Sequence, residues 1–335
     1  MKKTAWALAL LLALPLASAS SSKAEVTEIT VAQQFGVAFL PLMVMERNKL
    51  VEKYAEKSGL KGMKVNWAKV AGPAPMNDGL ISNTIHFAAQ GAPSMITLWD
   101  RTKGLVRGVS AMTTYPLYLV TRNPNVKTVR DLSAADKIVV PSVKISTQAI
   151  MLQMAAAKEF GQENYTKFDP FTVSLSHPDG LLAIMNNTAG VNGHFTSSPF
   201  YEQEMKLSGA RLLLTNYDIL GGPATAVVIT ANSKFAADNP RSFKAFVDAF
   251  KEAIDIINKD KRTAAQLYLE VANDKRNSID DILAIISDKD YIYTLRPQKV
   301  LATAQFMAKI GSIKQTPKTV EEMFFPEVIK GLKGD

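Results

Sequence analysis

The spacing of apolar residues changes repeatedly from a period of two to a period of 3.6, which predicts strands that run into helices. The first change lies within residues 28–50, where Ile29 and Val31 alternate with small or polar residues and a helical stripe begins at Phe39. The connecting residues 33–36 leave the carboxyl end of a strand and enter a helix. Ligands of open α/β sheets bind at such points, and helix amino termini favour anions.

The same strand–turn–helix arrangement recurs further along the chain. A buried strand at 84–90 is followed by the small-residue turn 91–94, and a strand at 137–140 leads through a loop into a helix. Ser146 or Thr147 is placed to cap that helix. Small residues let a ligand approach the backbone closely. The sequence therefore predicts further ligand-facing turns.

One helix–strand–turn unit occurs twice. Residues 78–93 and 179–199 each begin Asp-Gly-Leu, continue through Asn-Thr into a strand, and end in a turn that closes with proline. The match predicts two related α/β domains with corresponding turns, although so short a match can also arise by chance.

Two segments are candidates for crossings between these domains, residues 113–116 and the Gly-Gly-Pro sequence at 221–223. Gly and Pro can absorb the backbone change of a hinge, and each segment is also compatible with an ordinary turn. We expect lobe 1 to comprise 25–115 and 224–335, and lobe 2 to comprise 116–223. An apolar stripe at 3.6 spacing between Phe243 and Ile257 predicts a core helix in lobe 1.

The amino terminus has the pattern of an export signal. Lys2 and Lys3 precede an apolar run over 5–16, and small residues follow. The run is shorter than the roughly 20 residues that span a bilayer, although a buried or anchoring helix is the alternative. We expect residues 1–24 to be a signal peptide cleaved near residue 19 or 24, and the mature protein to be periplasmic.

Composition excludes several classes of protein. The chain has no cysteine, which excludes disulfides, a thiolate nucleophile, cysteine-based metal sites and a lipid-modified cysteine. Its net charge of +8 is spread out, without a basic-aromatic block. Motifs of serine hydrolases, zincins, P-loops and dinucleotide-binding turns are absent, and the three histidines lack ligand spacing. We expect no catalytic residue, cofactor, metal or nucleic-acid partner, and a monomer.

The order of these features resembles the periplasmic substrate-binding proteins of ABC importers, of the nitrate/sulfonate/taurine type that includes the thiamine-pyrimidine-precursor (NMT1/THI5-like) binders. The resemblance covers nearly all of the mature chain. The segments that carry it are Phe35-Gly36, Phe39-Leu40-Pro41-Leu42, Gly91-Ala92-Pro93, Val129-Arg130-Asp131-Leu132 with the strand after it, Ser146-Thr147, and residues 195–200.

The resemblance implies a type II periplasmic-binding-protein-like fold, with two α/β lobes joined by two crossover segments. The lobes would close on a small ligand and hand it to the transmembrane subunits of an ABC permease with a cytoplasmic ATPase. The family commonly has an acidic residue in the second-lobe unit and a tryptophan-acidic-proline turn. This chain has residues 191–194 (Val-Asn-Gly-His) and 197–199 (Ser-Ser-Pro) there, which argues against the usual ligand.

Candidate binding residues come from the turns described above. They are Gln33, Phe35, Phe39, Ala92, Ser94, Lys144, Ser146, Thr147, His177, His194 and Phe195. Amides and hydroxyls would hydrogen-bond the ligand, the backbone amides of Ser94 and Thr147 would hold an anionic end, and the phenyl rings would pack on its apolar part. A solvated surface position is the alternative for Lys144, and a structural role is the alternative for each histidine.

Three functions remain open at this point. The first is import of a small organic anion or polar-ended molecule, of sulfonate or aromatic type. The second is a THI5-like pyrimidine-precursor enzyme, although such enzymes depend on cysteines that this chain lacks. The third is a protein that presents its ligand to a sensor.

Overall fold

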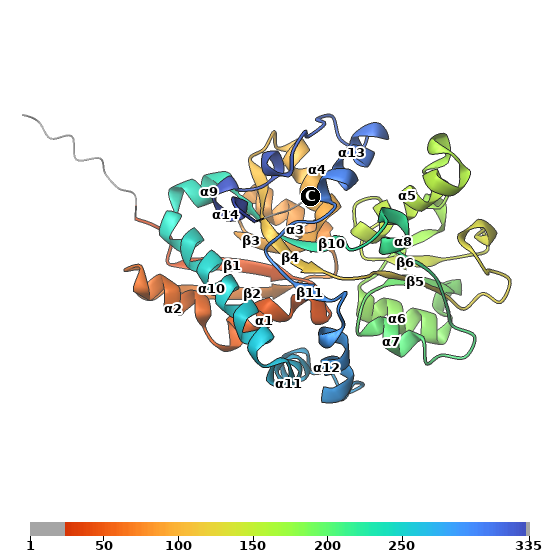
Figure 1. The fold of residues 1–335 in the computed structure, drawn as a ribbon, viewed down its shortest axis with the longest axis horizontal. Coiled ribbons are helices and arrows are strands. Elements are labelled where there is room, and N and C mark those ends of the chain that lie inside the picture. The colour runs from red at the N-terminus through yellow and green to blue at the C-terminus, as the bar shows by residue number, and fades with distance from the viewer. Residues whose placement is uncertain (1–23, 333–335) are drawn as a thin grey trace, which may run out of the picture.

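The computed structural model describes residues 24–332, which form two β-sheets side by side, each with helices on both faces (Figure 1). The predicted α/β class with two lobes is confirmed. The signal peptide predicted at 1–24 lies, apart from its last residue, outside the described residues. Within 24–332, no helix has both the length and the apolar character that crossing a membrane requires.

The first sheet has six strands in the order β11-β4-β10-β3-β1-β2, and the second has five in the order β7-β6-β8-β5-β9. The strands are β1 (Glu28–Gln33), β2 (Lys64–Lys69), β3 (Phe87–Gly91), β4 (Val106–Thr114), β5 (Tyr118–Thr121), β6 (Ile138–Val140), β7 (Thr172–Ser174), β8 (Gly193–Thr196), β9 (Arg211–Thr215), β10 (Thr225–Asn232) and β11 (Ile292–Tyr293).

Apart from the extra strand β11, the two sheets have the same arrangement of strands when the first is followed from β2 and the second from β7. In the first, β1 pairs in parallel with β2 and β3, and in the second, β6 pairs in parallel with β7 and β8. One antiparallel strand then follows in each sheet, β10 beside β3 and β5 beside β8. Parallel strands bring their carboxyl ends to one edge of a sheet, where ligands of such sheets bind.

Fourteen α-helices cover the two sheets within the described residues. They are α1 (Leu40–Arg47), α2 (Leu50–Lys57), α3 (Pro73–Ser82), α4 (Ala92–Arg101), α5 (Thr147–Phe160), α6 (His177–Asn186), α7 (Phe200–Glu204), α8 (Asn216–Leu220), α9 (Ser233–Asp238), α10 (Pro240–Lys259), α11 (Lys261–Ala272), α12 (Ile279–Ser287), α13 (Val300–Lys309) and α14 (Pro326–Ile329).

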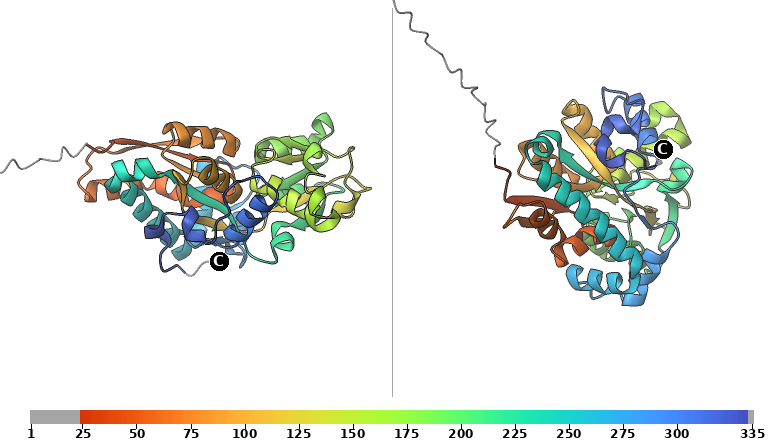
Figure 2. Two further views of the ribbon diagram at one scale, coloured as in Figure 1. Left: turned by 90° about the horizontal axis from the view of Figure 1, so that it is seen from above. Right: turned by 60° about the vertical axis from the view of Figure 1, so that its left-hand side comes forward.

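The long helix α10 lies along the first sheet (Figure 2), and its apolar stripe is buried in the core, as the sequence predicts. Phe246 of α10 stacks on Phe87 of β3 with ring centroids 3.8 Å apart. Burial of each such ring contributes about 1.5–3 kcal/mol to folding. On the opposite face of the sheet, Ala32 and Ala88 contact the side of α3 and α4, so lobe 1 is a three-layer α/β/α structure.

The helix–strand unit predicted to occur twice does so in the structure. Helices α3 and α6 both contain a glycine, Gly79 and Gly180, and both end at an asparagine in the left-handed region, Asn83 (φ 59°) and Asn187 (φ 50°). A Cβ atom at either glycine would lie within 3 Å of a side chain that follows the helix. Both units therefore pack their helix closely on the next strand.

The chain passes between the sheets twice, after β4 and after α8 (Figure 1). The first passage is hydrogen-bonded to the start of α8, the helix that precedes the second passage: the Leu117 amide donates to Oδ1 of Asn216 at 2.8 Å, and the Asn216 amide donates to the Leu117 carbonyl at 3.2 Å. We call the part with the first sheet lobe 1 and the part with the second sheet lobe 2. Their boundaries at 115/116 and 223/224 stay a prediction.

Candidate ligand-binding site

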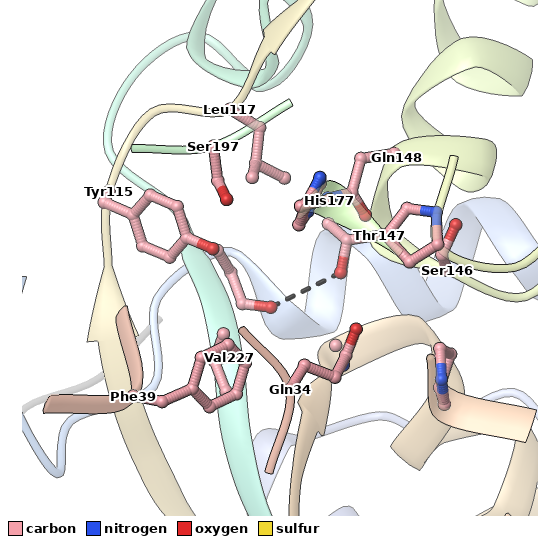
Figure 3. Close-up of a pocket in the computed structure, with 14 residues that line it drawn as sticks. Gln34, Phe39, Tyr115, Leu117, Ser146, Thr147, Gln148, His177, Ser197 and Val227 are labelled. Carbon is pink, nitrogen blue, oxygen red and sulfur yellow. Dashed lines mark hydrogen bonds between the residues drawn. The ribbon is translucent and has the colours of Figure 1, made fainter. Parts of the chain in front are cut away.

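A small, largely buried cavity lies between the lobes (Figure 3). The centres of water-sized spheres can occupy about 30 Å³ of it, which is room for about two water molecules. Its lining consists of Gln34, Phe39, Pro73, Gly91, Tyr115, Leu117, Pro141, Ser146, Thr147, Gln148, His177, Ser197, Ala226 and Val227.

Four helices begin at this cavity. Pro73 is the first residue of α3, Gly91 is the N-cap of α4, and Thr147 and His177 are the first residues of α5 and α6. Amides in the first turn of a helix have no partner within the helix and carry partial positive charge. Two helix starts from each lobe thus favour an anion, or the negative end of a polar group, in the same cavity.

Serine side chains fix where two of these helices begin. Ser146 caps α5, because its hydroxyl accepts from the Ala149 amide at 3.3 Å and donates to the Ser142 carbonyl at 2.7 Å. Ser176 caps α6 in the same way, accepting from the Asp179 amide at 3.3 Å. These caps hold Thr147 and His177 at the cavity wall.

Prolines mark where α4 and α6 begin. Helix α4 begins at Ala92, and α6 begins at His177. In each case a proline at the second helical position pre-sets the helical φ angle before the stripe begins. His177 is therefore a helical residue.

The two lobes touch around the cavity through glycines of lobe 1. A Cβ atom at Gly91 would lie 2.3 Å from Oγ1 of Thr147, and one at Gly72 would lie 2.4 Å from the carbonyl oxygen of Pro141. Real Cβ atoms essentially never approach other atoms this closely. The structure is thus a closed arrangement of the lobes that depends on glycine at both positions.

The cavity wall is polar, but none of its lining residues within 24–332 is Lys, Arg, Asp or Glu. Two amides, four hydroxyls and one imidazole face it, together with the apolar Phe39, Leu117 and Val227. The Tyr115 hydroxyl bonds to the Ser197 side chain, and burial raises the pKa of Tyr115 far above its usual value. Tyr115 therefore stays a neutral hydrogen-bond donor at physiological pH. Such a wall can hold an anion by dipoles alone.

Behind His177, a chain of buried side chains leads away from the cavity. Nδ1 of His177 lies 2.9 Å from Nε2 of His194, and Nδ1 of His194 lies 2.6 Å from Oε1 of Glu204. All three side chains are buried. Burial lowers the pKa of His194 to about 3, lowers that of His177 well below its usual value, and raises that of Glu204 well above it.

Four residues predicted from the sequence line the cavity. Phe39 comes from lobe 1, and Ser146, Thr147 and His177 come from lobe 2. Thr147 donates a hydrogen bond from Oγ1 to the Ala226 carbonyl at 3.3 Å, which crosses between the lobes (Figure 3). Residues far apart in the sequence thus meet at one place.

The other predicted residues lie outside this lining. Buried beside or behind it are Gln33, Ala92, Ser94, His194 and Phe195. Ser94 donates to the side chains of Asn77 or Gln90, each at 2.9 Å, inside lobe 1. Phe35 lines a neighbouring cavity, and Lys144 is exposed. A ligand-binding role for all of them stays a prediction.

Sequence reasoning missed Gln34, Tyr115, Gln148 and Ser197. Gln34 and Ser197 lie in turns that the pattern marks as ligand-facing, so the segment was predicted but not the side chain. Gln148 is the second residue of α5, beside the predicted Thr147. Tyr115 lies in the predicted crossing, and a ligand contact at a hinge has no separate signal in the sequence.

A larger cavity adjoins the first, with Gln34 in the lining of both. It offers about 440 Å³ to the centres of water-sized spheres and also has walls from both lobes. Three basic side chains line it, Lys69, Lys275 and Arg276, together with one acidic side chain, Asp274. The neighbouring cavity is therefore both roomier and more basic than the first.

Comparisons with known proteins matched solved structures only. No family model and no curated protein sequence matched the chain. The alkanesulfonate-binding protein SsuA from Xanthomonas axonopodis pv. citri, bound to MOPS, matches with 15% identity and a TM-score of 0.68, over 91% of this chain and 99% of that one. The periplasmic nitrate-binding protein NrtA from Synechocystis PCC 6803 matches with 15% identity and a TM-score of 0.67, over 92% and 90%.

A third similar structure comes from a eukaryote. The Candida albicans CA3427 gene product, described as having the generic periplasmic binding protein structural fold, matches with 16% identity and a TM-score of 0.64, over 88% of this chain and 94% of that one. The resemblance found in the sequence is thus confirmed at the level of the fold. This chain has the periplasmic-binding-protein fold, in the form shared by sulfonate- and nitrate-binding proteins.

Proposed function

We propose that the protein is an extracytoplasmic solute-binding protein that traps a small ligand between its lobes and delivers it to an ABC permease. The observation that carries this proposal is the convergence of four helix starts, two from each lobe, on one interlobe cavity. A ligand held by both lobes stabilises the closed form to the extent that it binds that form better than the open one.

The ligand is an organic molecule with one anionic or strongly polar end, of sulfonate or aromatic carboxylate type. Helix amino termini and neutral donors such as Tyr115 and Thr147 suit an anionic group. The first cavity, of about 30 Å³, admits only a small group. The body of the ligand would extend past Gln34 into the neighbouring cavity of about 440 Å³, where Phe35 and the basic side chains contact it.

The same proposal includes the location of the protein in the cell and its binding partners. The apolar run at 5–16 supports export, and the fold shared with proteins named for periplasmic sulfonate and nitrate binding supports delivery to a permease. The protein acts as a monomer with a small-molecule ligand, without a cofactor or a nucleic-acid partner. Because the chain has no cysteine, an enzyme of the THI5-like kind has less support than a binding protein.

A thermal-shift screen of the mature chain tests the proposal. The panel holds sulfonates, nitrate, aromatic carboxylates and pyrimidines, and each anion is paired with a neutral analogue, such as ethanesulfonamide for ethanesulfonate. A ligand that binds only the folded state raises the melting temperature by mass action. We expect anions to raise it and their neutral analogues to have little effect.

Variants then test whether the compound that raises the melting temperature most binds in the cavity. The double variant Phe39→Ala/Thr147→Ala removes one wall residue from each lobe, whereas Glu163→Ala changes an exposed residue of lobe 2. We expect the double variant to weaken binding at least 100-fold and the control to leave it unchanged. A panel without any anionic hit, or a double variant that binds as tightly as the wild type, would contradict the proposal.

A further inference from the structure

The buried chain of His177, His194 and Glu204 connects the cavity to a carboxyl group that the cavity itself lacks. At its open end, Nε2 of His177 lies 3.2 Å from the side-chain nitrogen of Gln148, and both residues line the cavity. At its closed end, Oε1 of Glu204 contacts His194, and Oε2 has no partner among the described residues. This row of hydrogen-bonded side chains therefore runs from the cavity wall to a single buried carboxyl group.

The contacts among His177, His194 and Glu204 are hydrogen bonds between side chains, and these side chains are not arranged as metal ligands. The two histidine nitrogens that face each other, Nδ1 of His177 and Nε2 of His194, are 2.9 Å apart. One of them must therefore donate to the other, and neither is free for a metal ion. Among residues 24–332, no group of three or more His, Asp or Glu side chains is arranged to hold a metal.

With Glu204 ionised, every bond in the chain points toward it. Nδ1–H of His194 donates to the carboxylate, Nδ1–H of His177 donates to Nε2 of His194, and the Gln148 amide donates to Nε2 of His177. This direction matches the recorded contact between the two nitrogens of Gln148 and His177. The imidazole of His177 is then an acceptor at the cavity wall.

One added proton reverses every bond. With the carboxyl group of Glu204 protonated, it donates to Nδ1 of His194, Nε2–H of His194 donates to Nδ1 of His177, and His177 carries its own proton on Nε2. His177 is then a donor, and the Gln148 amide must turn to offer its oxygen to His177 and its NH₂ group to the cavity.

We infer that His177, His194 and Glu204 form a proton relay, in which uptake of one proton at the buried end turns the cavity wall from acceptor to donor, so that an anionic ligand binds together with one proton. The ligand part of this inference rests on the proposed function. A donor wall hydrogen-bonds an anion, and protonation also removes the negative charge that would repel it. Relay residues other than His177 are positioning residues, because they act on the ligand only through it.

Few other titratable groups lie near the relay. Phe200 stacks on the His177 ring with centroids 5.7 Å apart and shields it. Glu202, on the same helix as Glu204, bonds to Ser198 and has its pKa raised by burial and, more weakly, by Glu204. Asp179, on the same helix as His177, bonds to the Ser176 cap, and Tyr115 lines the cavity opposite in the neutral form. Glu202 is therefore the carboxyl group whose uptake of the proton must be distinguished from that of Glu204.

Nitrogen NMR of the mature, ligand-free protein tests the relay without any ligand. Only three histidines contribute signals, and His86 is an internal reference, because its Nδ1 accepts from the Thr30 amide at 2.8 Å and its proton must lie on Nε2. Between about pH 5 and pH 9.5, we expect His177 and His194 to change tautomer together, with one midpoint and without becoming imidazolium ions. A fixed tautomer of His177 over this range would overturn the inference.

Variants assign the proton to Glu204. Glu204→Gln removes the titrating group and keeps its shape, so the joint change of tautomer should disappear, whereas the control Glu202→Gln should retain it. Thr196→Val is a milder variant, because the nearby Thr196 hydroxyl lowers the pKa of Glu204. Its loss should move the midpoint to higher pH. Loss of the transition in Glu202→Gln, or an unmoved midpoint in Thr196→Val, would place the proton elsewhere.

Titration calorimetry with ethanesulfonate, which stays anionic at every pH used, tests the coupling. In two buffers of different ionisation enthalpy, proton uptake on binding should rise from none below the relay midpoint to one above it. The Kd should rise tenfold per pH unit there and stay flat in Glu204→Gln. Binding without proton uptake above the midpoint would refute the coupling and leave the proposed function standing. Absence of binding by ethanesulfonate and by every other anion of the thermal-shift panel would refute the proposed function, while the NMR experiment still decides the relay.

Discussion

The Thr147 hydroxyl of lobe 2 donates to the Ala226 carbonyl of lobe 1 at 3.3 Å, directly beside Gly91. The backbone of Gly91 has φ −61° and ψ 143°, which any residue can adopt. Glycine is therefore needed here for space between the lobes and not for its conformation. The contact identifies the point where closure can be blocked without disturbing either lobe.

Gly91→Ala should hold the lobes apart. Its Cβ atom would lie 2.3 Å from Oγ1 of Thr147, so the closed form clashes while the open form does not. We expect unchanged or slightly higher stability, because alanine at a compatible site typically adds about 0.4–1 kcal/mol, a larger radius of gyration in X-ray scattering, and at least tenfold weaker ligand binding.

A second substitution provides the control for this prediction. Thr147→Ala in the Gly91→Ala chain removes the clashing oxygen, so the double variant should regain the compact scattering profile. Scattering is the deciding readout, since Thr147 is itself a candidate ligand contact. A compact Gly91→Ala single variant would show that the lobes do not close at this contact.

The Tyr115 hydroxyl should contribute to affinity but little to folding. It lies in the cavity wall and bonds to the Ser197 side chain. Tyr115→Phe keeps the ring, which stacks on Tyr291 with centroids 5.0 Å apart. We expect about tenfold weaker binding by calorimetry, the equivalent of about 1.4 kcal/mol, with the melting temperature of the free protein nearly unchanged. Unchanged affinity would mean that the ligand does not contact this hydroxyl.

A negative charge on the cavity wall should abolish anion binding. Gln148→Glu has nearly the same shape as the wild type, and the described residues of the wall include no Lys or Arg side chain to neutralise the added charge. We expect no measurable heat with an anionic ligand. Gln148→Met serves as the control, because it removes the hydrogen bonds without adding charge and should weaken binding only about tenfold. Equal effects of both variants would argue against an anionic ligand.

Acid should destabilise the fold through the buried histidines. Burial holds the pKa of His177 well below the ordinary value of 6.5, so its contribution to stability is present above pH 6.5 and is lost as the pH falls. Between about pH 7.5 and 5.5, His177 becomes protonated in the unfolded state but stays neutral in the folded state. This difference lowers the free energy of unfolding by about 1.4 kcal/mol. The contribution of Glu204 changes with pH in the opposite direction, because burial raises its pKa. Its contribution to stability is lost as the pH rises through this raised pKa.

Urea unfolding at the two pH values measures this effect. His177→Gln cannot take up the proton, so it should lose about 1.4 kcal/mol less than the wild type on acidification. The quantity to compare is the change in the free energy of unfolding between the two pH values, because the substitution also changes stability at each pH. Equal losses in the two proteins would mean that His177 titrates normally in the folded state.

Much of the fold follows from local patterns. The change of period after Val31 gave β1 and α1, the stripe from Phe243 gave α10, and Ser146 marked the start of α5, because side-chain spacing and helix caps act over a few residues. The repeated unit was visible for the same reason, since Gly79 and Gly180 meet the same packing need in each lobe.

The details of the cavity depend on how distant segments meet. Gln33 and Gln34 are neighbours, yet only Gln34 reaches the cavity, because alternate residues of a strand end face opposite ways. Glu204 follows His194 by ten residues and becomes its partner only once α7 packs beside α6 and β5. No spacing rule within the sequence predicts that contact.

A crystal structure of the mature protein with the strongest anion from the thermal-shift screen shows most directly whether both lobes hold the ligand. We expect electron density for the anionic group in the cavity between the lobes, within hydrogen-bond distance of Thr147 and of the Gln148–His177 pair, with the lobes closed as they are here. Density for the anion elsewhere, or a ligand held by one lobe alone, would contradict it.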